Sequence, residues 1–201
     1  MIKHFILIFF IFTLLHGVPL AGQKKNSFGI CSTIATGVPV SYSNIGAKGG
    51  PDYKNTGGFS LGIKYLLKLT TNIDLEIGLS YMYNKLTIVP IYDPAINNQS
   101  IETIAFIFFP LKLIYNLKNN FFVKGGINIS IDNFEEKHTT IKKQTGLGFN
   151  FGFGKKFNLG NNFVLNLSPQ LRIFNIIPFE HITFNDSYTD LGFSIGINYV
   201  Y

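Results

Sequence analysis

The sequence has little charge, a single cysteine and no apolar run long enough for a membrane helix. Charged residues make up 14% of the 201 positions and hydrophobic residues 46%, which excludes a disordered or acidic-tail protein. The lone Cys31 cannot form an internal disulfide and does not stand at a lipoprotein cleavage site. Beyond residue 22, Gly, Asn, Lys or Pro interrupts every apolar stretch before the roughly 20 residues that a membrane helix needs. A helical membrane protein is therefore excluded.

The N-terminus has the pattern of a secretory signal peptide. Lys3 precedes an apolar run from Phe5 to Leu15, and small residues follow near Gly22. We therefore predict a signal peptide over residues 1–22 and a mature domain over residues 23–201. Removing Lys3 from the 17 basic residues leaves 16 against 11 acidic residues. This excess is spread along the chain, and nucleic-acid binding, which favours a basic stripe on one face, is not expected.

The mature chain alternates large apolar residues with polar or small ones at a period of two. The alternation is clear in Phe59–Leu67, Ile73–Tyr83, Phe121–Ile131 and Leu191–Tyr201, and this period is typical of β-strands with one apolar face. Two segments, Phe28–Val40 and Ile104–Leu117, are less regular, and the second carries apolar residues in both phases.

The connections between the expected strands alternate in length. Short, turn-like connections are expected at Leu69–Asn72, Lys118–Asn120 and Asn158–Asn162, and long polar ones at Ser41–Gly57, Lys85–Ser100, Asp132–Thr145 and Asn175–Ser187. Outer-membrane barrels have short periplasmic turns and longer extracellular loops. We therefore predict an all-β protein, an up-and-down antiparallel membrane β-barrel of about eight strands. A soluble periplasmic β-sandwich is the alternative fold.

The phase of each strand assigns its residues to the lipid or to the lumen. A polar lumen network is predicted for Lys64, Asp74, Glu76, Lys112, Lys124, Arg172 and Asp190, because an eight-stranded barrel is just wide enough to be filled by side chains and buried charges need partners. An aromatic girdle at the periplasmic rim is predicted for Tyr65, Tyr115, Phe121, Phe157, Phe163, Tyr199 and Tyr201.

Several segments resemble the PorT-type outer-membrane β-barrel domain family. The residues Ile107–Tyr115 are similar to one strand of that family, Phe121–Gly126 to the next, the glycine-rich segment Gly146–Gly154 to the sixth, and Leu191–Tyr201 to the last. Pro39 and Cys31 in the first strand depart from the pattern. The resemblance implies the outer membrane of Gram-negative bacteria that use type IX secretion, and it implies no activity.

No residue pattern indicates catalysis. The loop and rim groups His138, His181, Asp186, Ser187, Glu135 and Glu136 lack the spacing of a triad or a calcium loop. We predict no catalytic residue, no metal and no cofactor, and a structural, interaction or secretion-accessory role. An outer-membrane lipid hydrolase or acyltransferase with a loop or rim site is the alternative. The expected partners are outer-membrane lipids and lipopolysaccharide, the barrel-assembly machinery, and an extracellular or secretion-complex protein.

Overall fold

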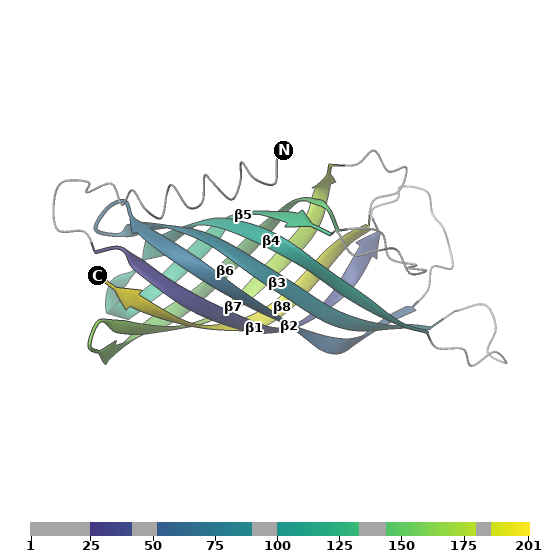
Figure 1. Cartoon of the computed structure of the whole chain (residues 1–201), viewed down its shortest axis with the longest axis horizontal. Coiled ribbons are helices and arrows are strands. Elements are labelled where there is room, and N and C mark those ends of the chain that lie inside the picture. The colour runs from purple at the N-terminus through teal and green to yellow at the C-terminus, as the bar shows by residue number, and fades with distance from the viewer. Residues whose placement is uncertain (1–24, 42–51, 90–99, 133–143, 180–185) are drawn as a thin grey trace.

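The computed structural model describes residues 25–41, 52–89, 100–132, 144–179 and 186–201, which form a closed antiparallel β-barrel (Figure 1). The strands are β1 (Ser27–Ser41), β2 (Asp52–Lys68), β3 (Ile73–Val89), β4 (Ser100–Asn116), β5 (Phe121–Ile131), β6 (Gly146–Gly160), β7 (Phe163–Pro178) and β8 (Asp186–Val200). Consecutive strands pair, and β1 also pairs with β8, which closes the barrel. The predicted fold class is confirmed. The predicted signal peptide, residues 1–22, lies outside the described residues.

One short helix, η1 (Lys118–Asn120), lies between β4 and β5. Within the described part of the chain, no helix has the length and apolarity to cross a membrane.

The strands extend further toward the long connections than the alternation predicts. β2 begins at Asp52 rather than after Gly57, β3 continues to Val89, and β7 continues to Pro178. A strand of 17 residues is about 55 Å long, and at a tilt of about 40° it spans roughly 40 Å, whereas the apolar band of such barrels is about 25 Å tall. Strand ends beyond this band meet water on their outer face, so backbone pairing continues there without an apolar–polar alternation.

The turns at the other end are tight and rich in asparagine. Asn161 and Asn162, which link β6 to β7, have φ angles of 47° and 66°, and Asn119 and Asn120 have φ angles of 59° and 63°. Two successive residues with positive φ are what a two-residue type I′ hairpin requires, and asparagine tolerates that conformation better than most residues. Because β6 continues to Gly160, the connection predicted over Asn158–Asn162 is shorter than expected.

The two faces of the wall differ as the alternation predicts. On β8, Ile195 is 45% exposed on the outer face, whereas the adjacent Ser194 is 8% exposed toward the lumen. The same contrast recurs around the barrel, where the exposed side chains include Ile30, Leu61, Leu113 and Phe153. Such an outer surface is unfavourable in water and suited to lipid.

The lumen has three zones along the barrel axis. An apolar group, here called the plug, lies toward the long connections and contains Met82, Leu86, Ile88, Ile104, Phe106, Phe108, Phe174 and Tyr188. Charged side chains occupy the middle. A smaller apolar group of Leu66, Ile114 and Phe122 lies toward the short turns, next to an open cavity. The apolar residues in both phases of Ile104–Leu117 are thereby explained, because Ile104, Phe106 and Phe108 face the lumen and form part of the plug.

Candidate functional site

The middle of the lumen holds three lysines around one glutamate, here called the central lysine cluster. Lys112 on β4 lies directly opposite Glu76 on β3 in the strand register, and its ammonium donates to Oε1 of Glu76 at 2.7 Å. The ammonium of Lys64, on β2, lies 3.8 Å from Oε2 of the same carboxylate. All three side chains are buried, so the ion pairs are screened little by solvent.

Lys124 on β5 is the third lysine of this cluster, and it donates a hydrogen bond to a neutral group. Its ammonium donates to the hydroxyl of Ser168 at 2.9 Å and lies 5.9 Å from the centre of the Phe122 ring. Gly152 leaves room for it, since a methyl group there would stand 2.9 Å from Cε of Lys124. The cluster therefore contains two more basic groups than acidic ones.

A separate ion pair joins β7 and β8 closer to the plug. Arg172 and Asp190 are opposite each other in the register, and two guanidinium nitrogens donate to the two carboxylate oxygens at 2.8 Å each. A third nitrogen donates to the hydroxyl of Ser60 at 2.8 Å. The rings of Phe108 and Phe174 lie 5.6 and 5.7 Å from the guanidinium carbon. This arrangement satisfies a buried charge pair by both hydrogen bonding and cation–π contact.

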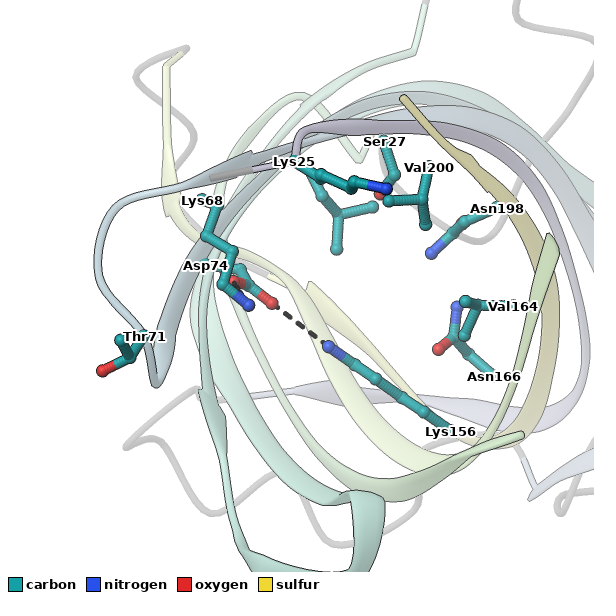
Figure 2. Close-up of a pocket in the computed structure, with 11 residues that line it drawn as sticks. Lys25, Ser27, Lys68, Thr71, Asp74, Lys156, Val164, Asn166, Asn198 and Val200 are labelled. Carbon is teal, nitrogen blue, oxygen red and sulfur yellow. Dashed lines mark hydrogen bonds and ion pairs between the residues drawn. The ribbon is translucent and has the colours of Figure 1, made fainter. Parts of the chain in front are cut away.

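The third group surrounds Asp74 at the mouth formed by the short turns. Oδ2 of Asp74 accepts hydrogen bonds from Lys156 at 3.1 Å and from the amide of Asn116 at 2.9 Å. The ammonium of Lys68 lies 3.9 Å from Oδ1. Asp74, Lys68 and Lys156 border a cavity of about 380 Å³ that is open to the outside, here called the vestibule (Figure 2).

The structure therefore places all seven residues of the predicted lumen network inside the barrel, but in three separate groups. Sequence reasoning missed Lys68, Lys156 and Asn116, which complete the group around Asp74. The signal for Lys156 was present, since it continues the inward phase of Gly152 and Gly154 on β6. Sequence reasoning also missed the plug.

The plug fills part of the lumen with packed rings. The ring centres of Phe106 and Phe174 are 4.8 Å apart, and those of Phe108 and Phe174 are 5.2 Å apart, both edge to face. Tyr188 lies in the same group and accepts a hydrogen bond from the amide of Asn84 at its hydroxyl. Deep in the lumen, the cavities beside the central lysine cluster measure about 20 and 10 Å³, room for about one water molecule each.

The seven predicted girdle residues lie near the short-turn end. Tyr115, Phe121, Phe157, Phe163, Tyr199 and Tyr201 are exposed, while Tyr65 is half-buried. The hydroxyls of Tyr65 and Tyr201 are 3.5 Å apart, and the rings of Phe163 and Tyr199 are 5.3 Å apart. The membrane-interface role remains a prediction.

The candidate catalytic groups are largely outside the described residues. His138, His181, Glu135 and Glu136 fall there, and so does the side chain of Asp186. Ser187 is buried, and its hydroxyl donates to the carbonyl of Asn175 at 3.2 Å, a contact typical of a structural serine. In the described ranges, no group of three or more His, Cys, Asp and Glu residues is placed to hold a metal ion.

Comparisons with known proteins agree with this architecture. A model of the outer membrane protein beta-barrel domain family matches residues 10–200. The chain is similar to the crystal structure of the outer membrane protein OprG from Pseudomonas aeruginosa, with 16% identity and a TM-score of 0.53 over 90% of this chain and 98% of that chain. It is also similar to the solid-state NMR structure of the outer membrane protein AlkL, with 15% identity and a TM-score of 0.55 over 90% and 92% of the two chains. These two likenesses concern the fold alone. No curated protein matches the chain.

Proposed function

The chain belongs to the outer membrane protein beta-barrel domain family and lies in the bacterial outer membrane, and from this premise we propose that it is a non-enzymatic barrel with a closed lumen. Its role in this proposal is structural or interactive. The barrel holds the long connections on one side of the membrane and contacts outer-membrane lipids, lipopolysaccharide and the barrel-assembly machinery through its wall. The narrower PorT-type assignment and a secretion-complex or extracellular protein partner are parts of the proposal.

The occluded lumen is the observation that supports the proposal most. A solute entering the vestibule meets the central lysine cluster, where the cavities are of single-water size, and then the plug. Opening a path would break buried ion pairs or separate packed rings, and breaking one buried pair alone costs about 3–5 kcal/mol. A barrel of eight strands has little space for an open channel when its interior is filled in this way.

A liposome assay tests the closed lumen and the absence of enzymatic activity together. Vesicles that contain the purified protein are diluted into arabinose for a swelling measurement, and into buffer for detection of released fatty acids from phospholipid. We expect neither swelling nor fatty-acid release above empty vesicles. Swelling contradicts the closed lumen. Release that disappears in Ser187→Ala supports the enzymatic alternative.

Cross-linking in living cells tests the interaction role. A photoreactive residue is placed in the connection 133–143, and in a matched strain in the short turn 118–120. We expect a protein adduct from the first position, because binding residues of proteins are found disproportionately on loops held by a rigid scaffold. Absence of an adduct, both from 133–143 and from the same residue placed in turn in 42–51, 90–99 and 180–185, contradicts an interaction role and leaves a structural one.

A further inference from the structure

We propose that the vestibule is a binding site for a small organic anion, one that carries a carboxylate or phosphate group on a short aliphatic body. The vestibule measures about 380 Å³, within the size range of small-molecule sites. It opens between the short turns, on the periplasmic side in the usual topology of such barrels. The inference is independent of the proposed interaction role.

The vestibule has an excess of positive charge. Lys25, Lys68 and Lys156 line it, and Asp74 is the one acidic residue among its lining residues. Asp74 is already contacted by Lys156, Lys68 and the Asn116 amide, which leaves it little attraction for a further cation. The central lysine cluster, deeper in the lumen, adds a formal excess of basic over acidic groups. Low-dielectric walls concentrate such a field along the cavity and favour an anion inside it.

Two buried carboxamides in the vestibule have unused hydrogen-bonding capacity. Asn166 on β7 and Asn198 on β8 are 6% and 3% exposed, and the side-chain oxygen of each has no hydrogen-bond partner among the described residues. Figure 2 shows both side chains at the side of the cavity that faces Asp74, with Lys156 extending from beside Asn166, its partner in the strand register, toward Asp74. Most buried polar groups in proteins have a partner. The unpartnered atoms are acceptors, so they indicate a hydroxyl or another donor on the ligand, while the carboxamide N–H groups and the lysines donate to its anionic group.

The remaining lining residues indicate the chemical character of the aliphatic part of the ligand. Leu66, Val164 and Val200 form an apolar side of the cavity, against which a short hydrocarbon part can pack. Figure 2 shows the Lys25 ammonium reaching over the rim toward Ser27 and Val200. Ammonium and amide N–H groups together donate to several oxygens, and charge-assisted hydrogen bonds to an oxyanion are the stronger kind. A cation would be repelled by the same lining.

The test is a titration of ¹⁵N-labelled full-length protein, purified from outer membranes, in lipid nanodiscs. Hexanoate and glycerol 3-phosphate are the anionic probes, and hexylamine and glycerol are the matched controls. We expect at least one anion to shift the side-chain amide signals of Asn166 and Asn198 in a saturable way, while hexylamine and glycerol leave them unchanged. Tighter binding of hexanoate assigns a carboxylate ligand, and tighter binding of glycerol 3-phosphate a phosphate ligand. If neither anion shifts these signals, the proposal is wrong.

Variants distinguish specific binding in the vestibule from a general attraction of anions to surface charge. Lys68→Gln and Lys156→Gln are each expected to weaken anion binding roughly tenfold, as for loss of a charge-assisted hydrogen bond. Lys118→Gln removes the same charge at the same end of the barrel but outside the vestibule lining, and is expected to bind normally. Asn198→Asp, nearly isosteric, is expected to abolish binding. Equal weakening by Lys118→Gln would overturn the proposal. This titration does not measure permeability, so a negative result would leave the separate proposal of a closed lumen intact.

Discussion

Arg172 and Asp190 form a bidentate ion pair in the lumen, with both nitrogen–oxygen distances at 2.8 Å. They face each other across β7 and β8, so the strand register sets their geometry. The pair lies at the border between the central lysine cluster and the plug, and Phe108 and Phe174 flank the guanidinium. It therefore couples the pairing of the two strands to the packing of the lumen.

Removal of one partner of this pair is expected to be costly. Asp190→Asn leaves a buried guanidinium without its counter-charge, and we expect a loss of about 3–5 kcal/mol in the free energy of unfolding. The double variant Arg172→Met with Asp190→Leu is expected to recover at least half of that loss. Urea unfolding in lipid vesicles measures both. A loss below about 1 kcal/mol for Asp190→Asn would contradict a tightly coupled pair.

The outward phase of β8 gives a second prediction. Ile195→Lys places a charge on the lipid face and is expected to cost about 2–4 kcal/mol if residue 195 lies near the bilayer midplane. Ser194→Ala, one residue away on the lumen face, is expected to change stability by less than about 0.5 kcal/mol. The same vesicle unfolding assay compares the two. Similar effects at both positions would refute the assignment of the outer surface to lipid.

The topology gives a third prediction. A tag within 133–143 is expected to be accessible from outside intact cells, whereas a tag within 118–120 is expected to be accessible only after the outer membrane is permeabilised, because short turns of such barrels face the periplasm. Protease cleavage at the tag, with blotting, measures accessibility. The reversed pattern would place the vestibule at the cell surface.

Closure of the sheet by its last strand gives a fourth prediction. β8 pairs with β1 over fifteen residues, from Ser27 opposite Val200 to Ser41 opposite Asp186. Deletion of Tyr199–Tyr201 shortens this seam and exposes backbone groups to lipid, at several kcal/mol for each unsatisfied group. We expect a sharp fall in the protein's outer-membrane level, measured by fractionation. Wild-type levels of the truncated chain would show that these residues are dispensable for closure.

The fold could be predicted from the sequence because lipid imposes one requirement on every strand. Each strand that crosses the membrane must present apolar side chains outward, so β8 shows Ile195 and Ile197 in one phase and Ser194 and Gly196 in the other. At strand ends beyond the lipid, where this requirement does not apply, the prediction of the strand boundaries failed. The first residues of β2 and the last residues of β7 alternate poorly, and the sequence indicated connections there.

The sequence predicted which side chains face the lumen, but not which of them contact one another. The inward phase of the strands placed Lys64, Glu76 and Lys112 together. The ion pair between Asp74 on β3 and Lys156 on β6 could not be predicted in this way, because these two strands are not neighbours in the sheet and the side chains meet across the lumen. The plug was obscured because β4 is apolar in both phases. The vestibule exists because side chains leave the lumen unfilled at the mouth formed by the short turns. No local sequence pattern indicates such a gap.

Single-channel recording tests the central claim, a closed lumen, most directly. Purified protein is inserted into a planar lipid bilayer, and its current is compared with that of a variant in which Phe106→Ala and Phe174→Ala remove rings of the plug. We expect no stable conductance from the wild-type protein, because within the described residues the cavities beside the central lysine cluster measure only about 20 and 10 Å³ and the packed rings of the plug lie next along the lumen. A steady, porin-like conductance of the wild-type protein would contradict the account.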